Sequence, residues 1–190
     1  MIRDPNALSL IIYIVKIGTR ILLVPIFTIY IINDKALGSL IIFIIASISD
    51  ALDGFIARVF HQKTDLGAYL DPLADKILLV TAYVTLAILK MIPPWLAVLI
   101  ISRDVIILLG VLVLYLNRHP VKVHPSLLSK STTCLQIATI LMILSNDYLS
   151  IEPIKIYAFW LTAGFTIASG LQYIRRGLVL LTQSENTDFA

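Results

Sequence analysis

Cysteine and charge are both scarce in this sequence. The single cysteine, Cys134, excludes an intramolecular disulfide and the usual cysteine-rich metal sites, and it is expected to be a small apolar helix residue. Only 14% of the 190 residues are charged, whereas a soluble globular domain carries about 25%. Hydrophobic residues make up 58% of the chain and occur in long runs. These features predict an integral membrane protein that folds as one compact domain.

We also find no internal repeat, no low-complexity segment and no evident cleavable signal in the sequence. Residues 1–20 carry Arg3, Asp4, Lys16 and Arg20, with no clean apolar core followed by a small-residue cleavage site. We therefore expect that the first membrane helices direct insertion.

The apolar runs predict an all-α fold with six transmembrane helices. These are Thr19–Ile32, Ala36–Phe60, Leu66–Leu89, Trp95–Leu116, Leu127–Ser145 and Ile154–Leu181. An interfacial helix is expected before them, around Ala7–Ile17. Polar or proline-containing breaks separate the runs, as loops require. Residues 1–182 are expected to form the single membrane domain, and residues 183–190 a frayed polar tail.

Lysine and arginine alternate between the two sides of this predicted bundle. Ten fall on one side: Arg3, Lys16, Arg20, Arg58, Lys63, Arg118, Lys122, Lys130, Arg175 and Arg176. Three fall on the other: Lys35, Lys90 and Lys155. Because positive charge marks the cytoplasmic side, both termini and the loops at 61–65 and 117–126 are predicted to be cytoplasmic.

Five aspartates lie between two of the apolar runs, in the segment SDALDGFIARVFHQKTDLGAYLDPLADK. They are Asp50, Asp53, Asp65, Asp71 and Asp75. If the two helices form an antiparallel hairpin, Asp50 lies at the depth of Asp75, and Gly54 at the depth of Asp71. Helical periodicity of about 100° per residue places the acids of each helix on one face. Four carboxylates therefore converge, while Asp65 is expected in the loop as a helix N-cap.

Such a cluster needs a positive counterpart. Each aspartate costs roughly 2.5–3.5 kcal/mol at the centre of a membrane helix. Lys76 and Arg58 are too few to balance four acids. Carboxylate ligands suit hard cations, so the sequence predicts one or two Mg²⁺ or Mn²⁺ ions.

Small residues share the faces that carry the acids. Gly54, Ala57 and Gly67 either allow close helix packing or leave room for a ligand beside the metal. Hard cations held by few carboxylates usually share their coordination with phosphate. A metal site with a cytoplasmic mouth therefore indicates phosphoryl chemistry on a lipid.

The spacing of these residues resembles the signature of the CDP-alcohol phosphatidyltransferases. The matching pattern is Asp50-x2-Asp53-Gly54-x2-Ala57-Arg58-x8-Gly67-x3-Asp71-x3-Asp75. Fixed residues at fixed gaps make the match specific, and the six-helix layout and length extend it over nearly the whole chain. The resemblance implies a phospholipid-synthesising enzyme that transfers a phosphatidyl group from CDP-diacylglycerol to an alcohol and releases CMP.

The resemblance also implies roles for the motif residues. Asp50, Asp53, Asp71 and Asp75 would hold one or two divalent ions on the pyrophosphate of the CDP group. The nucleotide would contact Gly54, Ala57, Arg58 and Gly67. Asp75 would also act as the general base that takes the proton of the acceptor hydroxyl, as a carboxylate beside that hydroxyl can.

Basic residues on the last three helices are candidates for binding an acceptor phosphate. Arg103 lies inside a predicted membrane helix. Because a charged side chain is costly there, an arginine at such a position is expected to have a function. Its alternative role is a structural ion pair with Asp104. Lys130, Arg175 and Arg176 fit the basic acceptor pocket of similar proteins, although Arg175 and Arg176 could equally be positive-inside anchors.

Two acceptor alcohols fit the pattern. The segments LGAYLDPLADKIL and TRILLVPIF resemble the branch that makes phosphatidylglycerol phosphate or cardiolipin. IISRDVII and LLSKSTTCLQ resemble cardiolipin synthases, and a Gly-Arg-Glu run typical of phosphatidylglycerophosphate synthases is absent. We expect glycerol 3-phosphate as acceptor, because it is the commoner one among similar bacterial proteins, with phosphatidylglycerol as the alternative.

The resemblance further implies a location and partners. A bacterial inner membrane, a cytoplasmic active site, contact with the bilayer and a homodimer are expected, and no nucleic-acid partner. An ion or proton transporter is the remaining alternative, because transporters also carry acids in helices. A transporter would need neither the small residues between the acids nor a site confined to the cytoplasmic third.

Overall fold

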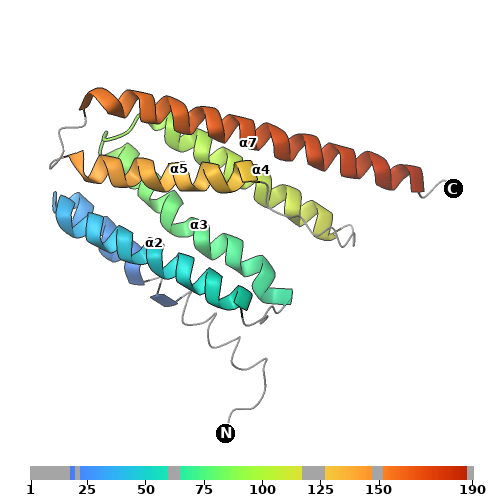
Figure 1. Cartoon of the computed structure of the whole chain (residues 1–190), viewed down its shortest axis with the longest axis horizontal. Coiled ribbons are helices and arrows are strands. Elements are labelled where there is room, and N and C mark those ends of the chain that lie inside the picture. Colours follow the sequence, from blue (N-terminus) through green and yellow to red (C-terminus); the bar gives the residue numbers. More distant parts are fainter. Residues whose placement is uncertain (1–17, 20–21, 60–64, 117–126, 147–151, 188–190) are drawn as a thin grey trace, which may run out of the picture. The chain divides into compact units, whose positions relative to one another are not determined.

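Every regular element in the described part of the chain is an α-helix (Figure 1). The computed structural model describes residues 18–19, 22–59, 65–116, 127–146 and 152–187, with side chains for 18–19, 22–49, 76–110, 127–146, 152–175 and 177. The helices are Leu22–Ile32, α2 at Ala36–Val59, α3 at Asp65–Ile88, α4 at Pro94–Leu116, α5 at Leu127–Leu144 and α7 at Glu152–Thr187. They group into two compact units, within Met1–Met91 with Ile140–Ile151 and within Ile92–Thr139 with Glu152–Ala190.

The predicted all-α fold is confirmed, and the bounds of α2 to α5 lie within one residue of the prediction at each end. Asp65 was expected in the loop and is instead the first residue of α3. The predicted tail was also wrong in part, because α7 continues to Thr187. Its last residues are polar but include neither proline nor glycine, and polar composition alone does not end a helix. The predicted interfacial helix at 7–17 lies outside the described residues.

Two tight helix ends shape the first unit. At each, a residue with positive φ follows the helix, Asp34 at 54° and Lys90 at 59°. The next amide then bonds back five residues, from Lys35 N to Tyr30 O at 3.0 Å and from Met91 N to Leu86 O at 2.9 Å. This is the Schellman geometry. Both helices therefore stop at defined residues.

Aromatic side chains fill the core of the first unit. Phe27 and Phe43 are fully buried, and their ring centroids are 5.7 Å apart with a tilt of 45°. On the same helix pair, the ring of Tyr30 covers Gly38 so closely that a Cβ built there would lie 2.3 Å from Tyr30 Cδ1. These contacts hold the Leu22–Ile32 helix against α2, the helix that carries Asp50 and Asp53.

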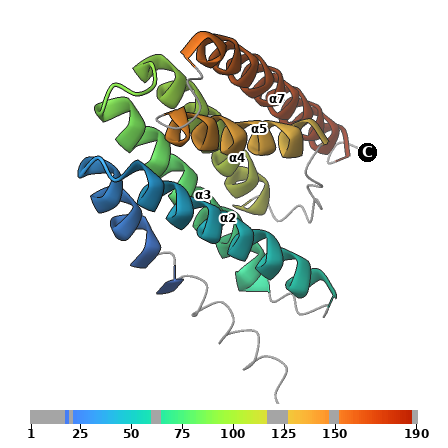
Figure 2. The same cartoon turned by 60° about the vertical axis from the view of Figure 1, so that its left-hand side comes forward.

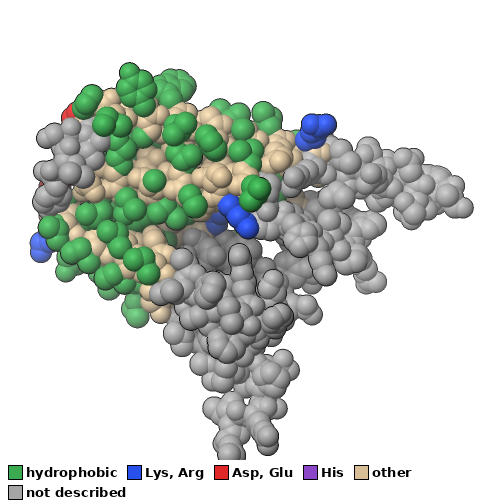
Figure 3. Space-filling model, in the orientation of Figure 1, with side chains coloured by type: hydrophobic (Ala, Val, Ile, Leu, Met, Phe, Trp, Pro, Cys, Tyr) green, Lys and Arg blue, Asp and Glu red, His purple; other side chains and the backbone are tan. Residues whose placement is uncertain are grey.

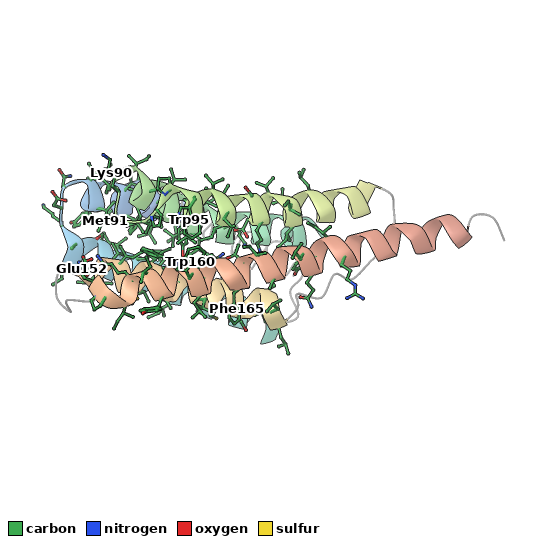
Figure 4. All side chains as sticks on the ribbon, turned by 90° about the horizontal axis from the view of Figure 1, so that it is seen from above. Lys90, Met91, Trp95, Glu152, Trp160 and Phe165 are labelled. Atoms are coloured by element: carbon green, nitrogen blue, oxygen red, sulfur yellow. The ribbon has the colours of Figure 1, made fainter. Side chains whose placement is uncertain are left out.

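Helices α4 and α7 build the second unit together with α5 as far as Thr139. Pro94 is the first residue of α4, a position that suits proline because no helical partner is needed for its missing N–H. α4 packs along α7, and near their starts Trp95 and Trp160 stack with ring centroids 5.5 Å apart (Figure 4).

The described surface is strongly apolar (Figure 3). Large hydrophobic side chains are widely exposed on it, among them Leu127 at 82% and Tyr157 at 74%. Two of the described helical segments, Leu127–Leu144 and Glu152–Arg175, are long and apolar enough to span a membrane. A surface of this kind is typical of a protein covered by lipid or by partners. The structure is consistent with a membrane protein, and the count of six crossings stays a prediction.

Candidate functional site

The residues of the predicted metal site lie on one helical hairpin. Asp50, Asp53, Gly54, Ala57 and Arg58 occupy the last three turns of α2. Gly67, Asp71 and Asp75 occupy the first three turns of α3. Figures 1 and 2 show the end of α2 beside the start of α3, with the two helices running in opposite directions.

The helical state of both segments supports the predicted faces. On a helix, positions three and four apart share a face, so positions 50, 53, 54 and 57 of α2 lie along one stripe, as do positions 67, 71 and 75 of α3. The side chains of all eight motif residues lie outside the described part. Among the side chains that are described, no group of three His, Cys, Asp or Glu residues could hold a metal. The ligand set stays a prediction.

Arg103 is the centre of a buried polar cluster in the second unit. Its side chain on α4 is only 4% exposed. Nη1 donates to Asp104 Oδ1 at 2.7 Å, and Nη2 donates to Ser129 Oγ at 2.6 Å and to Ser169 Oγ at 2.8 Å. Because Ser129 is on α5 and Ser169 on α7, one guanidinium joins three helices. The arm of Arg103 passes Gly170, where a Cβ would lie 3.6 Å from Arg103 Cγ.

The ion pair with Asp104, foreseen as the structural alternative for Arg103, is therefore present. It does not use all the donors of the arginine. A guanidinium has five N–H groups, and three of them make these bonds. Nε is buried and has no hydrogen-bond partner among the described residues. The cluster thus combines a structural pair with a nitrogen, Nε, that donates no hydrogen bond among the described residues.

Two of the other three basic candidates have described side chains, and neither is among the described hydrogen-bond partners of Arg103. Lys130 follows Ser129 on α5 and is exposed. Arg175 is exposed on α7, six residues beyond Ser169, which corresponds to about 9 Å along a helix. The side chain of Arg176 lies outside the described part. A shared acceptor pocket for the four residues stays a prediction.

Sequence reasoning missed a line of hydroxyl side chains between α5 and α7. We call it the hydroxyl seam; it consists of Ser129, Thr132 and Thr139 on α5 with Thr162, Thr166 and Ser169 on α7. Thr139 and Thr162 share a hydrogen bond at 2.7 Å, and Thr132 donates to the backbone oxygen of Phe165 at 3.2 Å. Their spacing of three, four or seven residues along each helix was the signal that could have found the seam.

Comparison with known proteins shows the family of this chain. Residues 14–168 match the family model described as CDP-alcohol phosphatidyltransferase. A relative from Bacillus subtilis (strain 168), named CDP-diacylglycerol–glycerol-3-phosphate 3-phosphatidyltransferase, is 31% identical over 97% of this chain and 100% of its own length. One of that name from Pseudomonas fluorescens is 32% identical over 82% of this chain and 84% of its own length. The human cardiolipin synthase (CMP-forming) is 33% identical over 91% of this chain, which spans 61% of that longer protein. The chain belongs to the CDP-alcohol phosphatidyltransferase family.

Proposed function

We propose that this protein transfers the phosphatidyl group of CDP-diacylglycerol to glycerol 3-phosphate and releases CMP. The observation that carries the proposal is the complete aspartate motif on the α2–α3 hairpin, in a chain that matches the family model over residues 14–168. The Bacillus subtilis relative, matched over its whole length, is named for this acceptor. Nothing in the chain favours the transporter alternative over the enzyme.

A divalent metal fits the donor set of the hairpin. Asp50, Asp53, Asp71 and Asp75 supply carboxylate oxygens only, which suit Mg²⁺ or Mn²⁺. We assign these four aspartates as ligands of one or two such ions. When bound, the metal would polarise phosphoryl oxygens and stabilise the leaving CMP.

The remaining motif residues have roles that follow from their chemistry. Gly54, Ala57 and Gly67 leave room for the nucleotide on the hairpin, and Arg58 supplies positive charge for it. Asp75 would take the proton of the acceptor hydroxyl as that oxygen attacks phosphorus. The bond to the phosphatidyl phosphorus forms at this hydroxyl, and the bond to the CMP oxygen breaks.

The phosphate of the acceptor is assigned to the basic residues of the last helices. Arg103 is buried with one donor available, while Lys130 and Arg175 are exposed and long enough to reach an anion. Arg176 directly follows Arg175 in the sequence. Arginine suits phosphate because its planar fork donates several hydrogen bonds at once.

The setting of the reaction is a lipid bilayer. The exposed apolar surface of the described helices supports contact with lipid. We place six helices across a bacterial inner membrane, with both termini and the active site on the cytoplasmic side, because positive charge collects in those loops. Similar proteins are homodimers, and we propose the same for this chain.

A second candidate, cardiolipin synthesis with phosphatidylglycerol as acceptor, has its own support. The human relative named cardiolipin synthase matches 91% of the chain at 33% identity. Phosphatidylglycerol also carries a phosphate, so the basic residues suit both acceptors.

The test is CMP release by the purified protein in detergent, with CDP-diacylglycerol and Mg²⁺ or Mn²⁺. Glycerol 3-phosphate, phosphatidylglycerol, inositol phosphate and serine are offered separately. Turnover with glycerol 3-phosphate supports the proposal, and turnover with phosphatidylglycerol alone replaces it by the second candidate. No CMP with any acceptor, from protein shown to be folded, contradicts both.

A further inference from the structure

The donors of Arg103 are engaged unequally. Nη2 donates to two hydroxyls, Ser129 Oγ and Ser169 Oγ, so both of its hydrogens are used. Nη1 uses one hydrogen on Asp104. Nε has no hydrogen-bond partner among the described residues, although the side chain is more than nine-tenths buried. Buried donors in folded proteins are almost always paired, so an unpaired one at this place indicates a ligand.

The two serines determine where that donor points. A guanidinium is planar and rigid, so anchoring two of its nitrogens sets the direction of the third N–H. Asp104 lies on the same helix as Arg103, so its bond to Nη1 could swing with the arginine arm. Ser129 and Ser169 come from two other helices and meet at the same nitrogen. Together they prevent rotation of the guanidinium about its arm.

The surroundings of the available donor favour an anion. Asp104 balances the charge of Arg103 within the cluster. Two further cations are exposed on the helices that carry the serines. Lys130 is adjacent to Ser129, and Arg175 lies beyond Ser169 on α7. A buried, oriented guanidinium N–H is a donor that phosphate oxygens accept, and the exposed cations on the same helices attract anions towards this part of the protein.

We propose that Ser129 and Ser169 are positioning residues, which hold the guanidinium of Arg103 so that its Nε–H donates to the phosphate of the acceptor alcohol. This inference rests on the proposed function, because the acceptor is the phosphate-bearing substrate of that reaction. It applies equally to the phosphomonoester of glycerol 3-phosphate and the phosphodiester of phosphatidylglycerol.

The test compares Ser129→Ala and Ser169→Ala with the wild-type protein in the CMP-release assay, with each acceptor titrated separately. We expect the KM for the acceptor to rise about tenfold in either variant, as the loss of one hydrogen bond to a charged group implies. kcat and the KM for CDP-diacylglycerol should stay at wild-type values, because neither serine lies on the motif hairpin. The acceptor that wild-type protein uses identifies the source of the phosphate.

A matched control lies in the same hydroxyl seam. Thr139 and Thr162 also bridge α5 and α7 by one hydrogen bond, at 2.7 Å, and neither bonds Arg103. Thr139→Val and Thr162→Val should lower the melting temperature and leave the KM for the acceptor unchanged. If the serine variants raise both KM values together, or if the threonine variants raise the acceptor KM equally, the serines only pack the helices and the inference is wrong.

A binding measurement separates this inference from the proposed function. Glycerol 3-phosphate should raise the melting temperature of wild-type protein, and the shift should vanish in the Ser129→Ala, Ser169→Ala double variant. A protein that releases no CMP but shows this serine-dependent shift would refute the proposed reaction and support the phosphate site. A shift that is the same in wild type and double variant, or absent from both with either acceptor, would overturn the site.

Discussion

Removing Asp104 should destabilise the protein more than removing the whole Arg103–Asp104 pair. The two side chains are 4% and 8% exposed, with Nη1 and Oδ1 2.7 Å apart. Deleting one partner of a buried ion pair costs about 3–5 kcal/mol, because a buried charge loses its compensation. The hydrogen bonds from Nη2 to the two serines survive in Asp104→Ala. We therefore expect the free energy of unfolding to fall by an amount near the lower end of that range, about 3 kcal/mol.

The double variant Arg103→Met, Asp104→Leu replaces the pair by apolar side chains. Such replacements are often neutral or stabilising. Here Ser129 and Ser169 lose their partner, but serine hydroxyls on a helix can turn to the carbonyl one turn back, so the loss should be about 1 kcal/mol. The double variant should therefore be about 2 kcal/mol more stable than Asp104→Ala, the difference between these two estimates.

Unfolding of the three proteins in mixed micelles, followed by circular dichroism against the fraction of SDS, measures these free energies. Asp104→Asn keeps an acceptor oxygen without the charge, and should lie between wild type and Asp104→Ala. If the double variant is as unstable as Asp104→Ala or less stable, the assumption of an uncompensated buried charge is refuted.

Activity then separates the two roles of Arg103. The double variant should lose only about 1 kcal/mol of stability but show a strongly raised acceptor KM, because methionine has no N–H to donate. If it binds the acceptor as wild type does, Arg103 is a structural residue only.

Three further outcomes are expected. Asp50→Asn or Asp71→Asn should abolish CMP release from protein that still inserts, because a metal ligand is lost; near-normal turnover in either would remove the metal assignment. EDTA should inactivate the wild-type protein, and added Mg²⁺ or Mn²⁺ should restore it, whereas activity in EDTA would argue against any metal. Lys90→Gly should raise the free energy of unfolding by about 1 kcal/mol, because glycine adopts the positive φ of 59° at the end of α3 without the Cβ penalty. Unchanged stability with unchanged activity would mean that this turn is not strained.

Helix positions followed from local features of the sequence. Long apolar runs separated by polar or proline-containing breaks located α2 to α5 to within one residue at each end, because a break such as KMIPP acts within a few residues of its own position. The end of α7 was missed for the same reason: no local breaker lies between Leu181 and Thr187. The family could also be identified from local sequence, because its motif consists of residues at fixed spacings on two helices joined by a short connection.

The ion pair of Arg103 with Asp104 was foreseen, but its two serine partners were beyond such reasoning. Ser129 and Ser169 are 26 and 66 residues away in sequence, and their small hydroxyls carry no periodic signal that distinguishes a packed helix face from an arginine partner. Lys130 attracted attention instead because it is charged, although it proves to be exposed.

The sequence by itself determined the helical segments, the family and the aspartate motif, because each depends on residues near one another along the chain. Only the tertiary structure decided that Arg103 is buried, that it joins α4, α5 and α7, and that its Nε has no hydrogen-bond partner among the described residues. Burial and hydrogen bonding between helices depend on how distant segments pack, and the pattern of any one segment does not contain that information.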